Sequence, residues 1–312
     1  MDLLLYCFAR GVISLIQSLP LRWAARFGRF GGAIAYRLDA RHRRVALRNL
    51  QMCFGNEKSD SELQAIAEEN FRRIGENFAC AAKTASMKFE DLRQHVQFIA
   101  PADILAPPEP RSIVAAIGHF GNFELYARFG QFAPSFRSAT TYRGLRQPSL
   151  NRLLQSLRER SGCEFFERRS QGPALRVFMN QKGAMLGLLS DQHAGDAGLR
   201  LPFLGHDCST TASPAIFALR YRCSLYTGIC YRVGLAQWRI EAGEEIPVYE
   251  NGEPRKTAAI MLDVNRAFEA AVRRDPANWF WVHNRWKPPP PGRAAPAPRE
   301  LPALQPSRAP GA

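Results

Sequence analysis

One segment of the chain combines a histidine, two glycines and a glutamate at a spacing that suits acid–base chemistry. It reads Ile117-Gly118-His119-Phe120-Gly121-Asn122-Phe123-Glu124. Gly118 and Gly121 permit a tight turn after a short apolar run, and a helix that follows this turn would carry Glu124 in its first turn. A histidine just before a helix can meet such a glutamate, although residues five apart inside a helix cannot. The carboxylate would then hold one ring nitrogen and make the other a base for an alcohol proton.

The His-x4-Glu pattern is weak evidence when it stands alone. With six histidines in 312 residues, such a spacing arises easily by chance. The simpler interpretation is a hydrogen-bonded core histidine followed by a glutamate that caps a helix. The catalytic interpretation is a base that deprotonates a hydroxyl without forming a covalent intermediate. Additional residues are needed to choose between them.

Arginines follow this segment in the chain. Arg143 precedes a predicted helix that carries Arg152, Arg158 and Arg160. Clustered arginines near a site can hold phosphate groups or a developing oxyanion. A solvated basic helix face is the alternative, and we prefer it for Arg152 and Arg160.

A second polar group follows another apolar run, which ends at Ser190-Asp191. Asp191, His193 and Asp196 would be candidate metal ligands. However, no second cluster completes a ligand set at a familiar spacing, so we expect no metal site.

Strands and helices alternate along the middle of the chain, which predicts an α/β fold with a mixed or largely parallel sheet. Buried strands are expected at 112–117, 184–189, 225–231 and around 238–240. Helices are expected at 61–84, 124–132, 150–160, 173–181, 214–221 and 257–273, the first of them with a capping box at Ser59 and Glu62. Sites in such sheets gather beyond the carboxyl ends of strands, which is where His119 and Asp191 fall.

The first 36 residues predict helices that associate with a membrane. Apolar side chains cover most of the first helical stretch, and the next one mixes aromatic residues with Arg22, Arg26 and Arg29. This combination suits the interface of an anionic membrane. Arg10 in mid-segment and Pro20 at its end argue against a clean span, and no basic region precedes the apolar stretch as in a signal peptide. A helix that packs on its own domain is the alternative.

The composition predicts a basic, folded protein. Hydrophobic residues make up 46% of the chain, and the net charge of +14 arises from 36 Arg and 6 Lys against 28 acidic residues. Such a surface favours anionic partners, although a GC-rich genome also enriches arginine. The seven cysteines form no CxxC pair, which argues against a disulfide framework and for a reducing compartment. Residues 288–312 hold nine prolines and are expected to be a disordered tail beyond a domain at 37–287.

Taken together, these features resemble the bacterial lipid A biosynthesis acyltransferases, the late-acting lauroyl/myristoyl transferase family. The resemblance runs through most of 1–287 and rests on the order and spacing of several motifs. Besides the His119 segment and the basic N-terminal part, these are Asn49-Leu50, Tyr142-Arg143, Arg158, Ser190-Asp191-Gln192, Pro202-Phe203-Leu204-Gly205 and His283-Asn284-Arg285-Trp286-Lys287.

The resemblance implies transfer of a fatty acyl chain from an acyl thioester, usually on acyl carrier protein, to a hydroxyl of a lipid A precursor. It implies an active site at the cytoplasmic face of the bacterial inner membrane. The implied fold is that of the glycerolphosphate acyltransferases, a mixed sheet flanked by helices with an apolar groove. Because a thioester is already activated, neither a cofactor nor a metal is expected. Acidic acyl carrier protein and a phosphorylated acceptor both fit a basic enzyme.

The resemblance also implies roles for individual residues. By it, His119 is the general base, and Glu124 orients and polarises the ring. Arg158 matches a family arginine at the active site. Further candidates for binding the acceptor or the donor are Arg143, Asp191 and Asn122.

Other functions remain as alternatives at this point. An acyl-CoA-dependent acyltransferase acting on another membrane glycolipid would keep the same chemistry. A catalytically inactive protein that binds membranes or anionic ligands would keep the fold alone. A metal-dependent hydrolase would lose its activity to a chelator. A nucleic-acid-binding protein would explain the charge, but no helix-turn-helix, zinc-finger or RNA-binding signature occurs, so nucleic acid is not expected as a partner.

Overall fold

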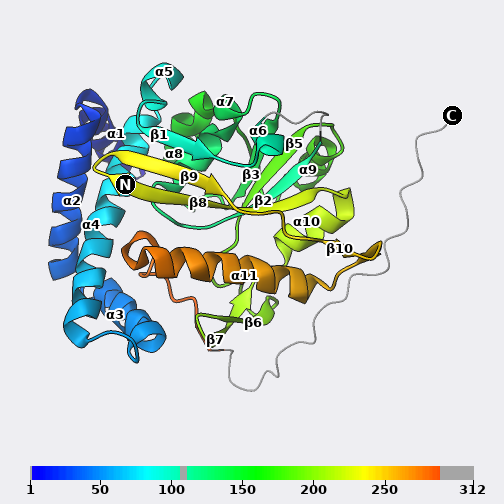
Figure 1. Ribbon diagram of the computed structural model, residues 1–312. Coiled ribbons are helices and arrows are strands. Elements are labelled where there is room, and N and C mark those ends of the chain that lie inside the picture. The colour runs from blue at the N-terminus through cyan, green and yellow to red at the C-terminus, as the bar shows by residue number, and fades with distance from the viewer. Residues whose placement is uncertain (1, 106–110, 289–312) are drawn as a thin grey trace.

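The computed structural model describes residues 2–105 and 111–288, which fold around one seven-stranded sheet (Figure 1). The strand order is β1-β9-β8-β2-β5-β3-β4, and every neighbouring pair is parallel except β8 with β9. The strands are β1 (Val96–Ile99), β2 (Ile113–Ile117), β3 (Arg137–Tyr142), β4 (Glu164–Glu167), β5 (Ala184–Leu189), β8 (Ser224–Gly234) and β9 (Gln237–Ala242). The mixed α/β fold predicted from the sequence is therefore confirmed.

The four strands expected from the sequence correspond to β2, β5, β8 and β9, whereas β1, β3 and β4 were not expected. β3 escaped recognition because its sequence, RSATTY, is largely polar. A further element that the sequence did not predict is the hairpin of β6 (Leu199–Phe203) and β7 (His206–Thr210).

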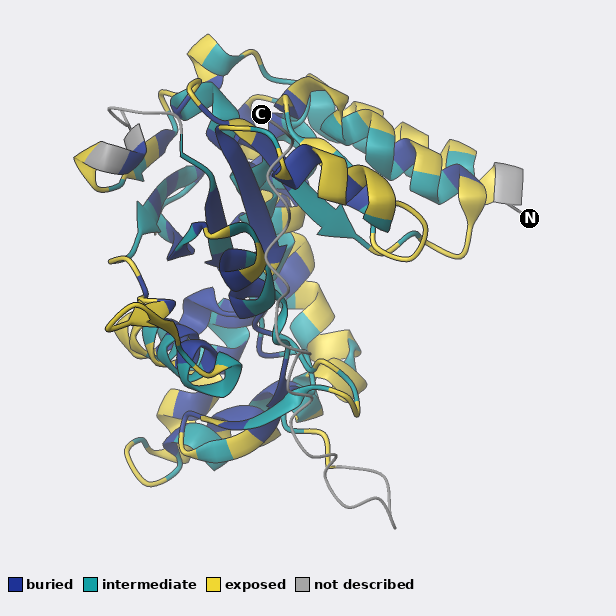
Figure 2. Cartoon of the chain, turned by 90° about the vertical axis from the view of Figure 1, so that its right-hand side faces the viewer, coloured by how far each residue is buried: buried dark blue, intermediate teal, exposed yellow. Residues whose placement is uncertain are grey.

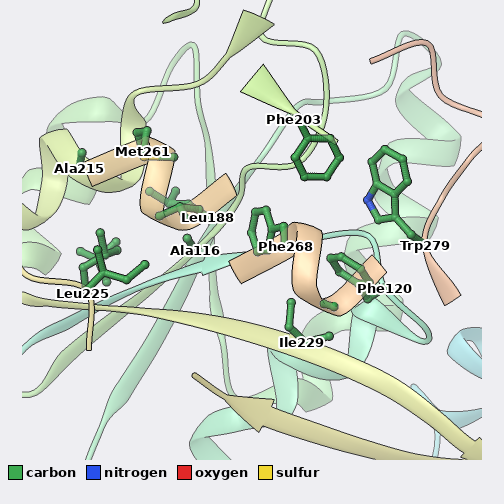
Figure 3. Packing of buried hydrophobic residues seen from close by; sticks show 14 of the residues in the cluster. Ala116, Phe120, Leu188, Phe203, Ala215, Leu225, Ile229, Met261, Phe268 and Trp279 are labelled. Atoms are coloured by element: carbon green, nitrogen blue, oxygen red, sulfur yellow. The ribbon is translucent and has the colours of Figure 1, made fainter. Parts of the chain in front are cut away.

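Helices α10 (Ser213–Tyr221) and α11 (Thr257–Arg274) bury one face of the sheet, as expected for their segments. Figure 3 shows this core, in which strand side chains such as Ala116, Leu188 and Leu225 meet Met261 and Phe268 of α11. All five are at most 5% exposed. Burial of these apolar side chains provides the main stabilisation of the fold.

The opposite face of the sheet is covered less completely. The segment expected as one helix at 124–132 is a 3-10 helix, η1 (Phe123–Arg128), followed by one turn of α-helix, α7 (Phe129–Phe132). Tertiary hydrogen bonds explain the difference, because the hydroxyl of Tyr126 donates to the carbonyl of Gly228 and accepts from the N–H of Cys230. These bonds to β8 override the local helical pattern. The incomplete cover leaves room for a cavity above the sheet.

Four helices form the N-terminal part, namely α1 (Asp2–Ser18), α2 (Leu21–Leu38), α3 (Ala40–Phe54) and α4 (Asp60–Thr84). The capping box of α4 is present at Ser59 and Glu62, as expected. Helices α2 and α4 pack closely because Gly28 and Gly75 face each other, and an added Cβ at Gly28 would overlap the carbonyl of Gly75. The boundary that the sequence predicts between the membrane-associated segment and the domain, at residue 36, lies inside α2. This helix packs on α4, which belongs to the domain.

Arg29 was expected on the lipid-facing side of this segment, but it points inward. Its guanidinium pairs with Glu69 at 2.8 Å and with Glu76 at 3.2 Å. The side chain of Glu76 is fully buried, and a buried carboxylate requires such a partner. Within residues 2–105 and 111–288, no helix has the length and apolar character that a membrane crossing needs.

The remaining α-helices are α5 (Phe89–Leu92), α6 (Ala102–Leu105), α8 (Pro148–Arg158) and α9 (Gly172–Met179). Two further 3-10 turns are η2 (Glu159–Ser161) and η3 (Pro276–Asn278). A small antiparallel hairpin consists of β10 (Tyr249–Glu250) and β11 (Glu253–Pro254). Helices α8 and α9 match the expected helices at 150–160 and 173–181. Figure 2 shows the central strands buried and the outer helix faces exposed. The proline-rich tail expected at 288–312 lies, from residue 289 on, outside the described residues.

Candidate active site

His119 and Asp191 meet at the carboxyl ends of two neighbouring parallel strands. β2 and β5 pair with Ile117 opposite Leu189, so the residues that follow them lie side by side. The ring Nδ1 of His119 lies 2.7 Å from Oδ1 of Asp191, and the backbone N–H of His119 donates to Oδ2 at 2.7 Å. Gly118 permits this approach, since an added Cβ there would lie 2.6 Å from the ring of Phe120 and 3.2 Å from Cγ of Asp191.

The carboxylate of Asp191 is buried and held at both oxygens. Trp279 donates its indole N–H to Oδ2 at 2.8 Å, and Asp191 itself is 0% exposed. Burial alone would raise the pKa of Asp191, but the charge on His119 and the hydrogen bonds from His119 and Trp279 lower it to about 2. Asp191 is therefore ionised at neutral pH.

The position of Glu124 corrects the expectation that this residue orients His119. Its carboxylate accepts two hydrogen bonds from Arg158, at 2.7 Å from Nη2 and 3.2 Å from Nε. The ring of His119 is held by Asp191 instead. A forked guanidinium binds a carboxylate at both oxygens more strongly than a single imidazole N–H can. Asp191, which was expected at a substrate-binding position, therefore holds the ring, and Glu124 pairs with Arg158 instead.

This arrangement assigns the tautomer of His119. An ionised carboxylate only accepts hydrogen bonds, so Nδ1 carries the proton and Nε2 keeps its lone pair. Among the described residues, no hydrogen bond engages Nε2. The ring is packed between Phe123, with centroids 4.8 Å apart, and Phe280, at 5.9 Å. A neutral imidazole held in this way can act as a base toward a group that enters from the adjoining cavity.

That cavity has a volume of about 1120 Å³ and lies over the less covered face of the sheet. Its floor consists of alternate residues of β2, β5 and β8, including Ala115, Gly187 and Gly228. These residues are small, and an added Cβ at Gly228 would lie 3.0 Å from Cγ2 of Ile117. Farther along, the walls are mainly apolar: Phe98, Ile104, Ile113, Phe129, Met185 and Ile240. The cavity is therefore suited to an alkyl chain.

Four exposed arginines line the same cavity, namely Arg143, Arg168, Arg176 and Arg220. Arg143 was singled out from the sequence, whereas Arg168 directly follows β4, Arg176 lies in α9 and Arg220 in α10. Nothing in their local sequence distinguishes them from other surface arginines. Together they make this part of the cavity wall basic, which suits an anionic ligand.

Arg158 lies between the basic and the apolar parts of the site. Its side chain is 15% exposed and lines the cavity beside Glu124. The guanidinium lies 4.7 Å above the ring of Phe165. Nη1 is buried, and among the described residues it has no hydrogen-bond partner. A buried N–H without a partner costs free energy until a group accepts a hydrogen bond from it.

Asn122 does not fit the expected contact with substrate. Its side chain is 1% exposed and lies at a separate small cavity of about 20 Å³, not at the wall of the large one. The tight turn turns Asn122 inward, since Gly121 adopts a positive φ of 48° and hydrogen-bonds to the carbonyl of Asn278. This position does not support substrate binding by Asn122.

The segment after α11 supplies site residues that sequence reasoning missed. Trp279 holds Asp191, and His283 lines the large cavity. Burial lowers the pKa of His283 to about 4, so its ring is neutral at pH 7 and accepts a hydrogen bond from the backbone N–H of His193. The sequence feature that could have indicated these residues is the dense aromatic run at 279–286. From the sequence alone, such a run cannot be distinguished from aromatic residues at the edge of a hydrophobic core.

Comparisons with known proteins identify the family. The family described as "Bacterial lipid A biosynthesis acyltransferase" matches residues 3–288. The chain is 25% identical over 297 residues to the lipid A biosynthesis palmitoleoyltransferase of Escherichia coli, covering 92% of each protein. It is also 25% identical over 293 residues to the lipid A biosynthesis lauroyltransferase of the same organism, covering 90% of this chain and 91% of the relative.

Proposed function

Because the chain belongs to the bacterial lipid A biosynthesis acyltransferases and is therefore an acyltransferase, we propose that it transfers a fatty acyl chain from acyl carrier protein to a hydroxyl of a lipid A precursor. One observation carries the proposal. The Asp191-held imidazole of His119 borders a cavity of about 1120 Å³ whose walls accept an alkyl chain. A base, an apolar cavity and a basic wall are the three requirements of this reaction.

The mechanism begins with the acceptor hydroxyl at Nε2 of His119. The imidazole takes the hydroxyl proton as the oxygen attacks the thioester carbonyl. The resulting tetrahedral oxyanion accepts a hydrogen bond from Nη1 of Arg158. When the intermediate collapses, the C–S bond breaks, the thiolate leaves and the imidazolium returns the proton to sulfur. Asp191 keeps the ring in the required tautomer and stabilises the imidazolium.

Glu124 acts in this scheme through Arg158. Its carboxylate receives two hydrogen bonds from the guanidinium and thereby fixes the plane from which Nη1 projects. Glu124 is therefore a positioning residue for the oxyanion donor. The sequence predicts that Glu124, in the first turn of η1, contacts His119, but its partner is Arg158.

Arg158→Lys is expected to lower kcat by about 10²-fold, because a lysine keeps the charge but cannot bind Glu124 at both oxygens and still direct an N–H at the oxyanion. The KM for the donor should change little. Initial rates of acyl transfer measure the effect. The matched control is Arg152→Lys, an exposed residue of the same helix that does not line the cavity. A kcat within about twofold of the wild type for Arg158→Lys would contradict this role.

The proposed donor is acyl carrier protein, which is strongly acidic. The exposed arginines of the cavity wall, Arg143, Arg168, Arg176 and Arg220, support this choice by charge complementarity. The test measures transfer to a lipid A precursor by mass spectrometry, with acyl-acyl carrier protein and acyl-CoA as alternative donors. Transfer from the carrier protein at low salt, declining as ionic strength rises, is the expected result. Turnover with acyl-CoA alone would favour the alternative donor, and no transfer from either would overturn the proposed function.

We further propose that the protein works at the cytoplasmic face of the inner membrane and contacts it through α1 and α2. Large apolar side chains project from both helices into solvent, among them Leu4, Phe8, Leu15, Trp23 and Phe30, which are 59–76% exposed. Arg22 and Arg26 flank the aromatic residues of α2. Basic and aromatic groups together suit an anionic lipid interface.

The double variant Trp23→Ser with Phe30→Ser is expected to weaken binding to vesicles containing anionic lipid by at least about tenfold, because it removes two large side chains from the interface. Vesicle co-sedimentation measures the binding. Val177→Ser provides the control, because Val177 is 64% exposed on α9, which packs on β4 and β5 and not on these helices. Unchanged sedimentation of the folded double variant would contradict the assignment.

A further inference from the structure

A second cavity, of about 750 Å³, lies among α1, α2, α4, α8 and η1. Its lining is distinct from that of the large cavity except at four residues that line both: Glu124, Ala127, Leu154 and Arg158. The two spaces therefore adjoin at the ion pair that positions the proposed oxyanion donor. We call the second space the helical groove.

The helical groove is apolar over most of its length. Its lining includes Ile13 and Ile16 of α1, Phe27 of α2, Ile74 of α4 and Leu157 of α8. Glycines and alanines of α2 and α4 keep it open: Gly28, Gly31, Gly32, Ala35, Ala81 and Ala82. Asp39, His42 and Arg128 also line it, and the ion pair of Glu124 and Arg158 lies where the groove meets the large cavity. A ligand of this shape and polarity has an alkyl part along the helices and a polar part at the ion pair.

The outer end of the groove connects with exposed apolar surface. Phe27 and Phe78 line the groove and are also 59% and 54% exposed. Trp23 and Phe30, one turn before and nearly one turn after Phe27 on α2, belong to the surface proposed to contact the membrane. Phe27 and Phe78 thus join the groove to the surface proposed to contact the membrane, which favours a membrane lipid as occupant.

We propose that the helical groove binds an acyl chain of the acceptor lipid, while the donor acyl chain occupies the large cavity. This inference rests on the proposed function. Transfer needs two alkyl-bearing substrates whose reacting atoms meet at His119. If both used the large cavity they would compete, whereas two cavities that adjoin at Glu124 and Arg158 let them bind together. The groove thus binds the acceptor through an acyl chain, and the length of the groove determines which acceptors fit.

Gly31 offers a direct test, because it lines the groove and an added Cβ there would meet no atom within 4 Å. Gly31→Phe would place a ring in the groove. Ala270→Phe is the matched control, since Ala270 is exposed on α11 and lines neither the groove nor the large cavity. Gly31→Leu provides a smaller obstruction in case the first variant does not fold. Each variant is assayed as the full chain, with its melting temperature as a check on folding.

The assay compares a lipid A precursor with an analogue whose acyl chains are shortened. Gly31→Phe is expected to raise the KM for the long-chain acceptor by at least about tenfold, and to leave the KM for the short-chain analogue and for the donor unchanged. Ala270→Phe should match the wild type. Equal kinetics of Gly31→Phe and wild type with the long-chain acceptor would overturn the inference, as would a higher KM for the donor. Failure of the proposed function is distinguishable, because the wild type would then acylate neither acceptor.

A labelling experiment gives an independent readout. An acceptor with a photoreactive group at the end of one acyl chain is irradiated with the wild-type enzyme, and labelled peptides are identified by mass spectrometry. Labels on α2 and α4 are expected, and Gly31→Phe should abolish them. Labels on the sheet residues of the large cavity, such as Met185 or Tyr226, would instead place the acceptor chain there and overturn the inference.

Discussion

Replacing His119 with alanine is expected to lower kcat for acyl transfer by about 10³- to 10⁴-fold, the contribution typical of a well-placed general base. The variant should stay folded, because the ring lies at the wall of the large cavity and the backbone N–H of residue 119 still donates to Asp191. Mass spectrometry of the acylated product at saturating donor and acceptor measures the rate, and the melting temperature reports on the fold.

The large size of this effect follows from the buried carboxylate that holds the ring of His119 as a base. Two other imidazoles, those of His193 and His283, line the cavity, and His283 uses Nε2 to accept a hydrogen bond from the backbone N–H of His193. Glu124 is occupied by Arg158, and Asp191 is fully buried. His95→Ala is the control, because this histidine lines neither cavity and bonds to the turn at Ala236. Turnover at the wild-type rate by folded His119→Ala enzyme would remove the mechanism.

Asp191→Asn is expected to lower kcat by about 10³-fold while changing the KM of either substrate little. An amide can donate a hydrogen bond to Nδ1, which would force the proton of His119 onto Nε2 and leave no lone pair for the acceptor hydroxyl. Glu124→Gln separates this role from the one that the sequence predicted. It should cost only about tenfold, through Arg158. A larger loss with Glu124→Gln than with Asp191→Asn would show that Glu124 is the residue that orients the base.

Acid unfolding gives a second readout for Asp191. Its pKa is about 2 in the folded protein, below the ordinary value of 3.8, so the unfolded chain binds this proton more readily. The ionised carboxylate therefore contributes stability that is fully present above about pH 4 and is lost as the pH falls toward 2, a difference of about 2 kcal/mol. Chemical denaturation at pH 6 and pH 3 should show a smaller acid loss for Asp191→Asn than for the wild type. Equal losses would contradict the assigned pKa.

The sequence by itself determined the elements whose patterns are local. The capping box at Ser59 and the apolar strands at 113–117 and 184–189 all follow from residues close together in the chain. The same local patterns put His119 and Asp191 at strand ends. The family was also recognisable, because motif order and spacing are properties of the chain itself.

Elements with polar sequences were harder to predict. β3 reads as a loop because Ser138, Thr140 and Tyr142 alternate along it. Those residues line the large cavity, so the polar side chains that made the strand hard to predict are part of the site. The hairpin of β6 and β7 was hidden in the same way by a proline and a glycine inside a short apolar segment.

Only the tertiary structure decided which carboxylate holds the base. Glu124 lies five residues from His119 and Asp191 lies 72 residues away, yet the strand order sets β2 against β5 and brings the distant residue to 2.7 Å. Glu124, the nearer residue, is bound at both carboxylate oxygens by Arg158 of α8. Sequence spacing limits which side chains can meet along one helix or turn. Across a sheet, the pairing of strands determines the contacts, and that pairing comes from burial summed over the whole domain.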